Sequence, residues 1–353
     1  DVYKRQGEMA LGPVTKTNPP LITDLIKSKA QLRKLLDKDA VLPGRKNYPD
    51  MLRDALEAEK FGTFRMLCHD DGYMPGFGPG DEVEIQVLGP VVEKVNGGIA
   101  GLRDFGSTGL TKNGHSVVLR LTYGGVRMLL GGDLNIPAEK LLLHSIMGKP
   151  VPEKPSALPA YIQKARKKLE VDIAKSCHHG SADFSSLFLS AVNPIVTVIS
   201  SGDDEPHSHP RAETLGAIGV NSRGERPLIF STELARSAKD AIRDPANERR
   251  QLKAAHLSVL KAATAVSTAR SAGEKAEARK RKNAANKSFR RLVDDTINRT
   301  VQVYGAIYVR TDGKDVVIGQ RIERGWAGRQ WDVSSLHPGA TGELQFVSKY
   351  HGE

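Results

Sequence analysis

The pattern of apolar and polar positions divides the chain into a strand-rich body and one long polar helical segment. Short apolar or alternating runs predict strands, and apolar residues that recur every three to four positions predict helices. The predicted helices are Leu21–Leu36, Tyr48–Phe61, Pro137–Ile146, Ala160–Leu169 and Ser185–Ala191. The predicted strands are Glu82–Leu88, Ser116–Thr122, Val126–Leu130, Val171–Ser176, Ile195–Ser200, Pro227–Ser231, Val301–Val309 and Val316–Arg321. Buried strands together with covering helices predict a layered α/β protein.

The segment between Arg236 and Arg299 has a different composition from the rest of the chain. It is rich in Ala, Lys and Arg and contains neither Trp nor Tyr, which favours helix. Apolar residues recur at helical spacing on both sides of Ser271-Ala272-Gly273, where the pattern breaks. We therefore predict a helical hairpin inserted into the α/β body.

Positive charge is concentrated in this hairpin. The whole chain has 52 Lys and Arg against 41 Asp and Glu, a formal net charge of +11 at pH 7. Residues 236–299 contain 17 Lys and Arg and 7 Asp and Glu, so they account for +10 of that charge. Any nucleic-acid contact predicted from the basic composition is therefore local to the insertion.

Nucleic-acid contacts from the hairpin would be made to the phosphate backbone. With neither Trp nor Tyr for base stacking, sequence-specific recognition of single strands is not expected. A solvated helix face or a coiled-coil-like dimer arm would explain the same composition, and the sequence leaves the oligomeric state open. The candidate contacts are Arg279, Lys280, Arg281, Lys282, Arg290 and Arg291.

Overall composition limits the class of protein. With 39% hydrophobic and 26% charged residues, the chain is neither disordered nor collagen-like. No apolar run reaches the ~20 residues of a membrane-spanning helix, so no membrane partner is expected. Two cysteines, Cys68 and Cys177, are too few for a disulfide framework and favour a cytoplasmic location. We expect a partial α/β domain over residues 7–232, the hairpin over 236–299, and completing strands with a tail over 300–353.

The first candidate for chemistry is Asp133, which follows a short buried strand and two glycines. A carboxylate at the end of a strand can bridge metal ions. The same residue could also begin the helix Pro137–Ile146 as an N-cap, or occupy a simple turn. Taken alone, this motif favours an N-cap or a simple turn over a metal ligand.

Two histidine motifs follow later strands. His178 and His179 stand side by side before Gly180, after the strand Val171–Ser176. Paired imidazoles in a turn bring titratable groups together without an evident packing benefit, which favours metal binding or catalysis. His207 and His209 form an H-x-H that could chelate a metal or belong to a polar surface loop, and the sequence does not choose between them.

In combination, these motifs resemble the metallo-β-lactamase superfamily. The resemblance is closest to the metallohydrolase domain of ComEC-type DNA-internalisation proteins and their free-standing relatives. It covers roughly Glu82 to Ser231, and the order and spacing of several short motifs make it specific. The motifs are N-G-H-S-V-V-L-R-L (Asn113–Leu121), L-L-G-G-D (Leu129–Asp133), H-H-G-S (His178–Ser181) and S-H-P (Ser208–Pro210).

The resemblance implies an αββα sandwich with a metal site at one edge, usually of two zinc ions, with manganese as an alternative. Asp133 corresponds to the bridging carboxylate, and His179, or its neighbour His178, to the last histidine ligand. His115, or alternatively Asn113, stands in the place of an intermediate ligand. His209 would contact a phosphate or assist a leaving group. A metal-activated water in such a site hydrolyses esters, amides or phosphodiesters.

One departure from the superfamily pattern affects the expected activity. The H-x-H-x-D-H motif that supplies most metal ligands is absent from the sequence, and Cys68-His69-Asp70-Asp71 has the wrong spacing to replace it. Either the chain is a fragment, which its start without Met favours, or the protein is degenerate. We expect a metal-dependent hydrolase, nuclease-like and acting on phosphodiesters, that binds metal weakly and is inactive as this chain. The alternatives are a small ester, lactone or amide hydrolase and a non-catalytic nucleic-acid or protein-binding module.

Overall fold

The computed structural model describes residues 11–37, 47–58, 64–95, 98–202, 209–224, 227–232, 245–301, 305–321 and 331–347. Its helices are α2 (Lys29–Leu36), α3 (Asn47–Glu57), α4 (Thr108–Gly114), α5 (Ile136–Met147), α6 (Leu158–Leu169), α7 (Ser186–Val192), α8 (Ala212–Asn221), α10 (Pro245–Thr268) and α11 (Ala272–Val301). Short 3-10 turns are η1 (His69–Asp71), η2 (Pro155–Ala157) and η3 (Cys177–Gly180). The strands are β1 (Leu21–Ile22), β2 (Val83–Gly89), β3 (Val92–Val95), β4 (Ile99–Arg103), β5 (Val118–Tyr123), β6 (Val126–Leu130), β7 (Ile173–Lys175), β8 (Val196–Ile199), β9 (Leu228–Ser231), β10 (Ile307–Thr311), β11 (Val316–Arg321), β12 (Trp331–Pro338) and β13 (Leu344–Val347).

A six-stranded mixed sheet, in the order β2-β5-β6-β7-β8-β9, forms the centre of the body. Strands β2, β5 and β6 are antiparallel, whereas β6 to β9 pair in parallel. Parallel neighbours need crossover connections, and α5 to α8 lie in these connections. The carboxyl ends of β6, β7 and β8 therefore meet at one edge of the sheet.

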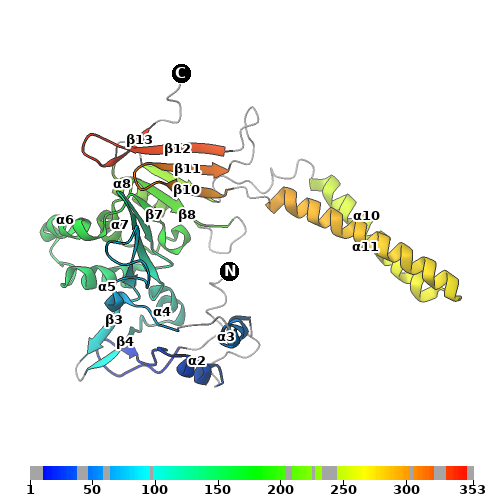
Figure 1. Cartoon of the computed structure of the whole chain (residues 1–353), viewed down its shortest axis with the longest axis horizontal. Helices are drawn as coiled ribbons and strands as arrows, with labels where there is room; N and C mark the ends of the chain where they lie inside the picture. Colours follow the sequence, from blue (N-terminus) through cyan, green and yellow to red (C-terminus); the bar gives the residue numbers. More distant parts are fainter. Residues whose placement is uncertain are drawn as a thin grey trace.

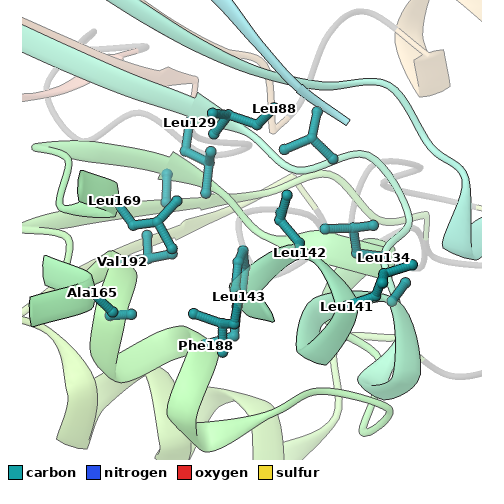
Figure 2. Close-up of a cluster of buried hydrophobic side chains, with 14 of the residues drawn as sticks. Leu88, Leu129, Leu134, Leu141, Leu142, Leu143, Ala165, Leu169, Phe188 and Val192 are labelled. Carbon is teal, nitrogen blue, oxygen red and sulfur yellow. The ribbon is translucent and has the colours of Figure 1, made fainter. Parts of the chain in front are cut away.

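The main hydrophobic core lies between this sheet and the helices (Figure 2). Leu129 of β6 is buried against side chains from α5 and α7, including Leu142 and Phe188. The expected helices Pro137–Ile146 and Ser185–Ala191 appear as α5 and α7. Asn135 caps α5 by accepting a hydrogen bond from the Ala138 amide at 3.3 Å.

A second, four-stranded antiparallel sheet, β10-β11-β12-β13, covers the other face of the mixed sheet (Figure 1). Val316 and Ile318 of β11 are buried in this second core with Val196 of β8. On the outer face of the second sheet, Tyr308 and Val317 remain 51% and 42% exposed. The described residues therefore form helix, sheet and sheet layers, and they place no helix layer over that outer face.

The N-terminal region departs from the sequence prediction. Only Lys29–Leu36 of the expected helix Leu21–Leu36 is helical, because Ser28 caps it and Leu21 and Ile22 instead pair with β4. Strands β3 and β4 and helix α4 have no counterpart in the prediction. The expected strand Val301–Val309 is also wrong in its first half, since α11 extends to Val301 and β10 begins at Ile307.

Helices α10 and α11 pack side by side as a hairpin, and Figure 1 shows the pair extending away from both sheets. Phe289 of α11 contacts His256 of α10, with ring centroids 5.5 Å apart. Ser271 caps α11 by accepting a hydrogen bond from the Glu274 amide at 3.2 Å. Among the described residues, no helix combines the length and the apolar character needed to cross a bilayer.

The two sheets also touch through a pair of tight turns. The Gly125 amide, between β5 and β6, donates a 2.7 Å hydrogen bond to the Gly313 carbonyl in the β10–β11 turn. Gly124 has a φ of +56°, and a Cβ placed on it would lie 2.4 Å from the Gly313 oxygen. Only glycine fits this contact without moving one turn away from the other.

We expect Gly124→Ala to lower the free energy of unfolding by about 1–3 kcal/mol, because it adds both backbone strain and a clash. Urea unfolding measures the change. Gly109→Ala is the matched control, since Gly109 is in α4 and its added Cβ would meet nothing within 4 Å. Equal effects of the two substitutions would contradict the importance of this inter-sheet contact.

Candidate metal site at the ends of β6, β7 and β8

Asp133 lies directly after β6 in a turn that only glycines can form. A Cβ on Gly131 would lie 2.5 Å from the Cys177 sulfur, and one on Gly132 would lie 2.5 Å from the Ser116 Cβ. The Asp133 amide donates a 2.9 Å hydrogen bond to the Ser116 hydroxyl. These contacts hold the carboxylate beside the turn that follows β7.

His179 is the direct partner of Asp133. Its Nε2 lies 3.4 Å from Asp133 Oδ1, and its Nδ1 donates a 2.6 Å hydrogen bond to the Ser200 carbonyl. The hydrogen bond to Asp133 is the largest cause of the raised pKa of His179. Burial acts to raise the pKa of Asp133, but the His179 hydrogen bond and the charges of His179 and Lys175 together lower it.

His178 points to a different side of the turn. Its Nε2 lies 3.5 Å from the Asn113 side-chain nitrogen, and its ring meets the buried His209 ring edge-on at 5.7 Å. The two histidines diverge because both have left-handed backbone angles, with φ of 46° and 54°. Such angles are costly for residues other than glycine and cluster at functional sites.

The structure groups Asn113 with the paired histidines and places His115 elsewhere. His115 is the C-cap residue of α4, its Nε2 donates a 2.7 Å hydrogen bond to the Arg103 carbonyl, and its ring stacks on Phe105. Burial is the largest cause of its lowered pKa. Of the two alternatives for an intermediate ligand, Asn113 is the one that lies beside His178. His207 lies outside the described residues.

Sequence reasoning missed Lys175, the last residue of β7. Its ammonium donates a 2.9 Å hydrogen bond to the Gly132 carbonyl and lies 3.8 Å from Asp133 Oδ1. The Lys175 side chain is only 24% exposed. A fixed positive charge therefore stands next to the candidate metal-binding carboxylate.

Glu139 is the second residue that the sequence did not single out. It is fully buried in α5, where its Oε2 accepts a 2.5 Å hydrogen bond from the Ser185 amide. Burial raises its pKa to about 8. Burial also raises the pKa of the Cys177 thiol well above its usual value, and the charge of the nearby Glu139 carboxylate raises it further. Glu139 thus joins α5 to the start of α7.

Asp133 and His179 fit one divalent metal ion as a pair of ligands. Two tetrahedral ligands of zinc at ~2.0–2.1 Å are about 3.3 Å apart, close to the observed 3.4 Å between Oδ1 and Nε2. Because the Nδ1 proton of His179 is donated to the Ser200 carbonyl, the neutral ring keeps its lone pair on Nε2, the nitrogen beside Asp133. Two protein ligands alone would hold zinc weakly.

Among the described residues, the only group of three or more close ligand atoms from His, Cys, Asp or Glu is Cys68, His69 and Asp70. His69 Nδ1 accepts a 3.2 Å hydrogen bond from the Val92 amide, so the ring proton is on Nε2, 3.2 Å from Asp70 Oδ1. No lone pair remains on that ring for a metal. Burial is also the largest cause of the raised pKa of the Cys68 thiol. This group is better explained as a hydrogen-bonded turn before β2.

Comparison with known proteins does not assign the chain to a family. No family model matches the chain, and neither the curated proteins nor the solved structures contain a match.

Proposed function

We propose that this chain provides part of the active site of a metal-dependent phosphodiesterase of the metallo-β-lactamase type. The observation that carries the proposal is the Asp133–His179 pair, 3.4 Å apart at the end of two parallel strands, with His179 oriented by Ser200. Ligand sites in open α/β sheets are typically found at this edge. The order of motifs along the sequence is the second support.

The chain's own residues would have separate tasks in this site. Asp133 and His179 would bind the ion through Oδ1 and Nε2, with the ion displacing the proton on His179. A bound zinc or manganese ion supplies a Lewis acid and a water whose pKa is lowered toward ~7. Asn113 and His209 flank His178 and would position its ring. Since His209 is only 8% exposed and its ring packs edge-on against His178, we assign it a positioning task and not direct contact with substrate.

Lys175 favours a phosphodiester over a neutral ester. Its ammonium lies 3.8 Å from Asp133 Oδ1, so an anionic oxygen bound at the metal would meet a second positive charge. A phosphodiester carries one negative charge before attack and gains more on its phosphoryl oxygens as hydroxide adds, and fixed cations stabilise that charge. A carboxylic ester or lactone is neutral before attack, so it has no charge to bind beside Lys175.

The proposal is tested with the chain joined to an upstream segment that carries H-x-H-x-D-H, because two protein ligands alone hold an ion weakly. Loaded with zinc or manganese, this protein is expected to cleave bis-nitrophenyl phosphate and DNA or RNA. Asp133→Asn is expected to lower that rate at least ~100-fold. Elemental analysis should find bound metal.

Two results would overturn the proposal. Cleavage of nitrophenyl acetate or a lactone, with phosphodiesters untouched, would favour a small ester or lactone hydrolase. Absence of both bound metal and hydrolysis would favour a non-catalytic binding module.

A further inference from the structure

The surface of α11 that faces away from α10 carries a row of five positively charged side chains, between Arg279 and Arg291. At 3.6 residues per turn, the five residues fall within a sector of about 120° and over a length of about 18 Å. All five side chains are exposed. We name this row the α11 stripe; its members are Arg279, Lys280, Lys287, Arg290 and Arg291.

The opposite side of α11 packs against α10. Ala278 is 8% exposed there, and Phe289 contacts His256. Ala278 and Phe289, which mark the apolar seam, lie about 150° around the helix from the centre of the α11 stripe, so packing against α10 leaves the five stripe side chains exposed. The hairpin extends away from the sheets, so the body does not cover it (Figure 1).

The structure separates the stripe from the other candidate cations. Arg281 points to a different sector and pairs with Glu277 at 3.4 Å. Lys282 is half-buried beside the seam. From residue 279 to residue 292 the sequence contains no Asp or Glu.

We infer that the α11 stripe binds the phosphate backbone of a nucleic-acid duplex without reading its base sequence. Three arginines and two lysines along about 18 Å match a line of successive phosphates, which arginine and lysine neutralise with release of counterions. Base readout needs side chains that enter a groove or stack on bases. The stripe has no aromatic side chain to stack on bases, and Phe289 of the same helix is engaged in the seam.

As a statement about the substrate class, this inference rests on the proposed function. The binding itself is measured in EDTA, where the metal site does not act. Failure of duplex binding would therefore leave hydrolysis of small phosphodiesters untouched, and failure of hydrolysis would leave duplex binding untouched.

The test compares two variants of the full chain with the same charge change. The stripe variant is Lys280→Gln, Lys287→Gln and Arg290→Gln. The control variant is Lys253→Gln, Lys261→Gln and Arg250→Gln, which removes two lysines and one arginine from the outer face of α10. All six side chains are exposed, so neither variant should disturb packing, and circular dichroism checks the helix content.

Fluorescence anisotropy with labelled duplexes of about 30 base pairs measures Kd between ~50 and ~200 mM salt. The stripe variant is expected to bind at least ~10-fold more weakly at low salt, with the slope of log K against log salt reduced by about 2–3. The control variant should stay within about twofold of the wild-type Kd. Two duplexes of unrelated sequence should bind alike, and a DNA and an RNA duplex are compared to identify the preferred backbone.

Several outcomes would overturn the inference. Equal weakening by both variants would show diffuse attraction to net charge, and no weakening by either would exclude the stripe. A large difference between the two unrelated sequences would show base readout. Competition by polyglutamate as effective as competition by DNA at equal charge would indicate an acidic protein partner in place of nucleic acid.

Discussion

Replacing Asp133 with asparagine is expected to abolish the stabilisation of this protein by zinc. Asp133 Oδ1 and His179 Nε2 are the two atoms that fit a shared ion, 3.4 Å apart. A ligand that binds only the folded state adds RT ln(1 + [L]/Kd), about 2.7 kcal/mol at a concentration 100 times Kd. An amide oxygen carries no charge for the ion, so the variant's Kd should rise well above the working concentration.

Thermal unfolding with increasing zinc measures this effect, with calcium as a cation that prefers oxygen ligands. For a folded body of this size, 2.7 kcal/mol corresponds to a rise in Tm of about 5–10 °C, which Asp133→Asn should lose. Asp70→Asn is the matched control, because Asp70 belongs to the Cys68–His69–Asp70 group. If Asp70→Asn removed the zinc response and Asp133→Asn did not, the ion would bind at η1 and the proposed site would be wrong.

Short-range sequence pattern predicted the parts of this site that depend on one strand and its following turn. Asp133 and His179 each come directly after a buried strand, and parallel pairing brings such ends together. The choice between Asn113 and His115 could not be made in the same way. It depends on α4, which ends at Gly114 and turns the His115 ring toward Arg103.

Lys175 and Glu139 could not be identified because their environments come from distant segments. In the sequence, Lys175 is one polar residue at the end of a strand, and its contact with Gly132 exists only once β6 and β7 pair. Glu139 resembles an ordinary acidic residue in the first turn of a helix. Its burial depends on Ser185, which lies 46 residues further along the chain.

The position of the second sheet also depends on contacts between segments that are distant in the sequence. The predicted strands Val301–Val309 and Val316–Arg321 correspond in part to β10 and in full to β11, but nothing local indicated which face of the mixed sheet they cover. That placement depends on apolar contacts such as Val316 and Ile318 with Val196, and on the close approach of Gly124 to Gly313. The hairpin connects to these strands without contributing to either core, which is why its charge pattern could be interpreted separately.

Glu139→Gln is expected to remove a large loss of stability that the wild-type protein undergoes as pH rises. Burial raises the folded-state pKa of Glu139 from 4.5 to about 8. Between these values the unfolded chain is ionised at this residue and the folded protein keeps its proton. The folded state therefore binds more protons, and the free energy of unfolding falls as pH increases from about 4.5 to about 8, by an amount on the order of 5 kcal/mol.

Glutamine cannot ionise, and its side-chain oxygen can still accept the hydrogen bond that the Ser185 amide donates to Glu139 Oε2. Its side-chain NH₂ would replace Oε1, which has no hydrogen-bond partner among the described residues, and this cost is independent of pH. The quantity to measure is thus the difference in urea unfolding free energy between variant and wild type, in EDTA, from pH 5.5 to pH 8. We expect it to shift by several kcal/mol in favour of the variant across that range.

Glu213→Gln is the control, since Glu213 is an exposed glutamate in the first turn of α8. Its difference from wild type should stay constant within about 0.5 kcal/mol over the same pH range. Other titrating groups, including Asp133 and His179, are common to the wild type and both variants, so their contributions cancel. A constant difference for Glu139→Gln as well would mean that Glu139 is ionised in the folded protein, and that its contact with the Ser185 amide is a charged one.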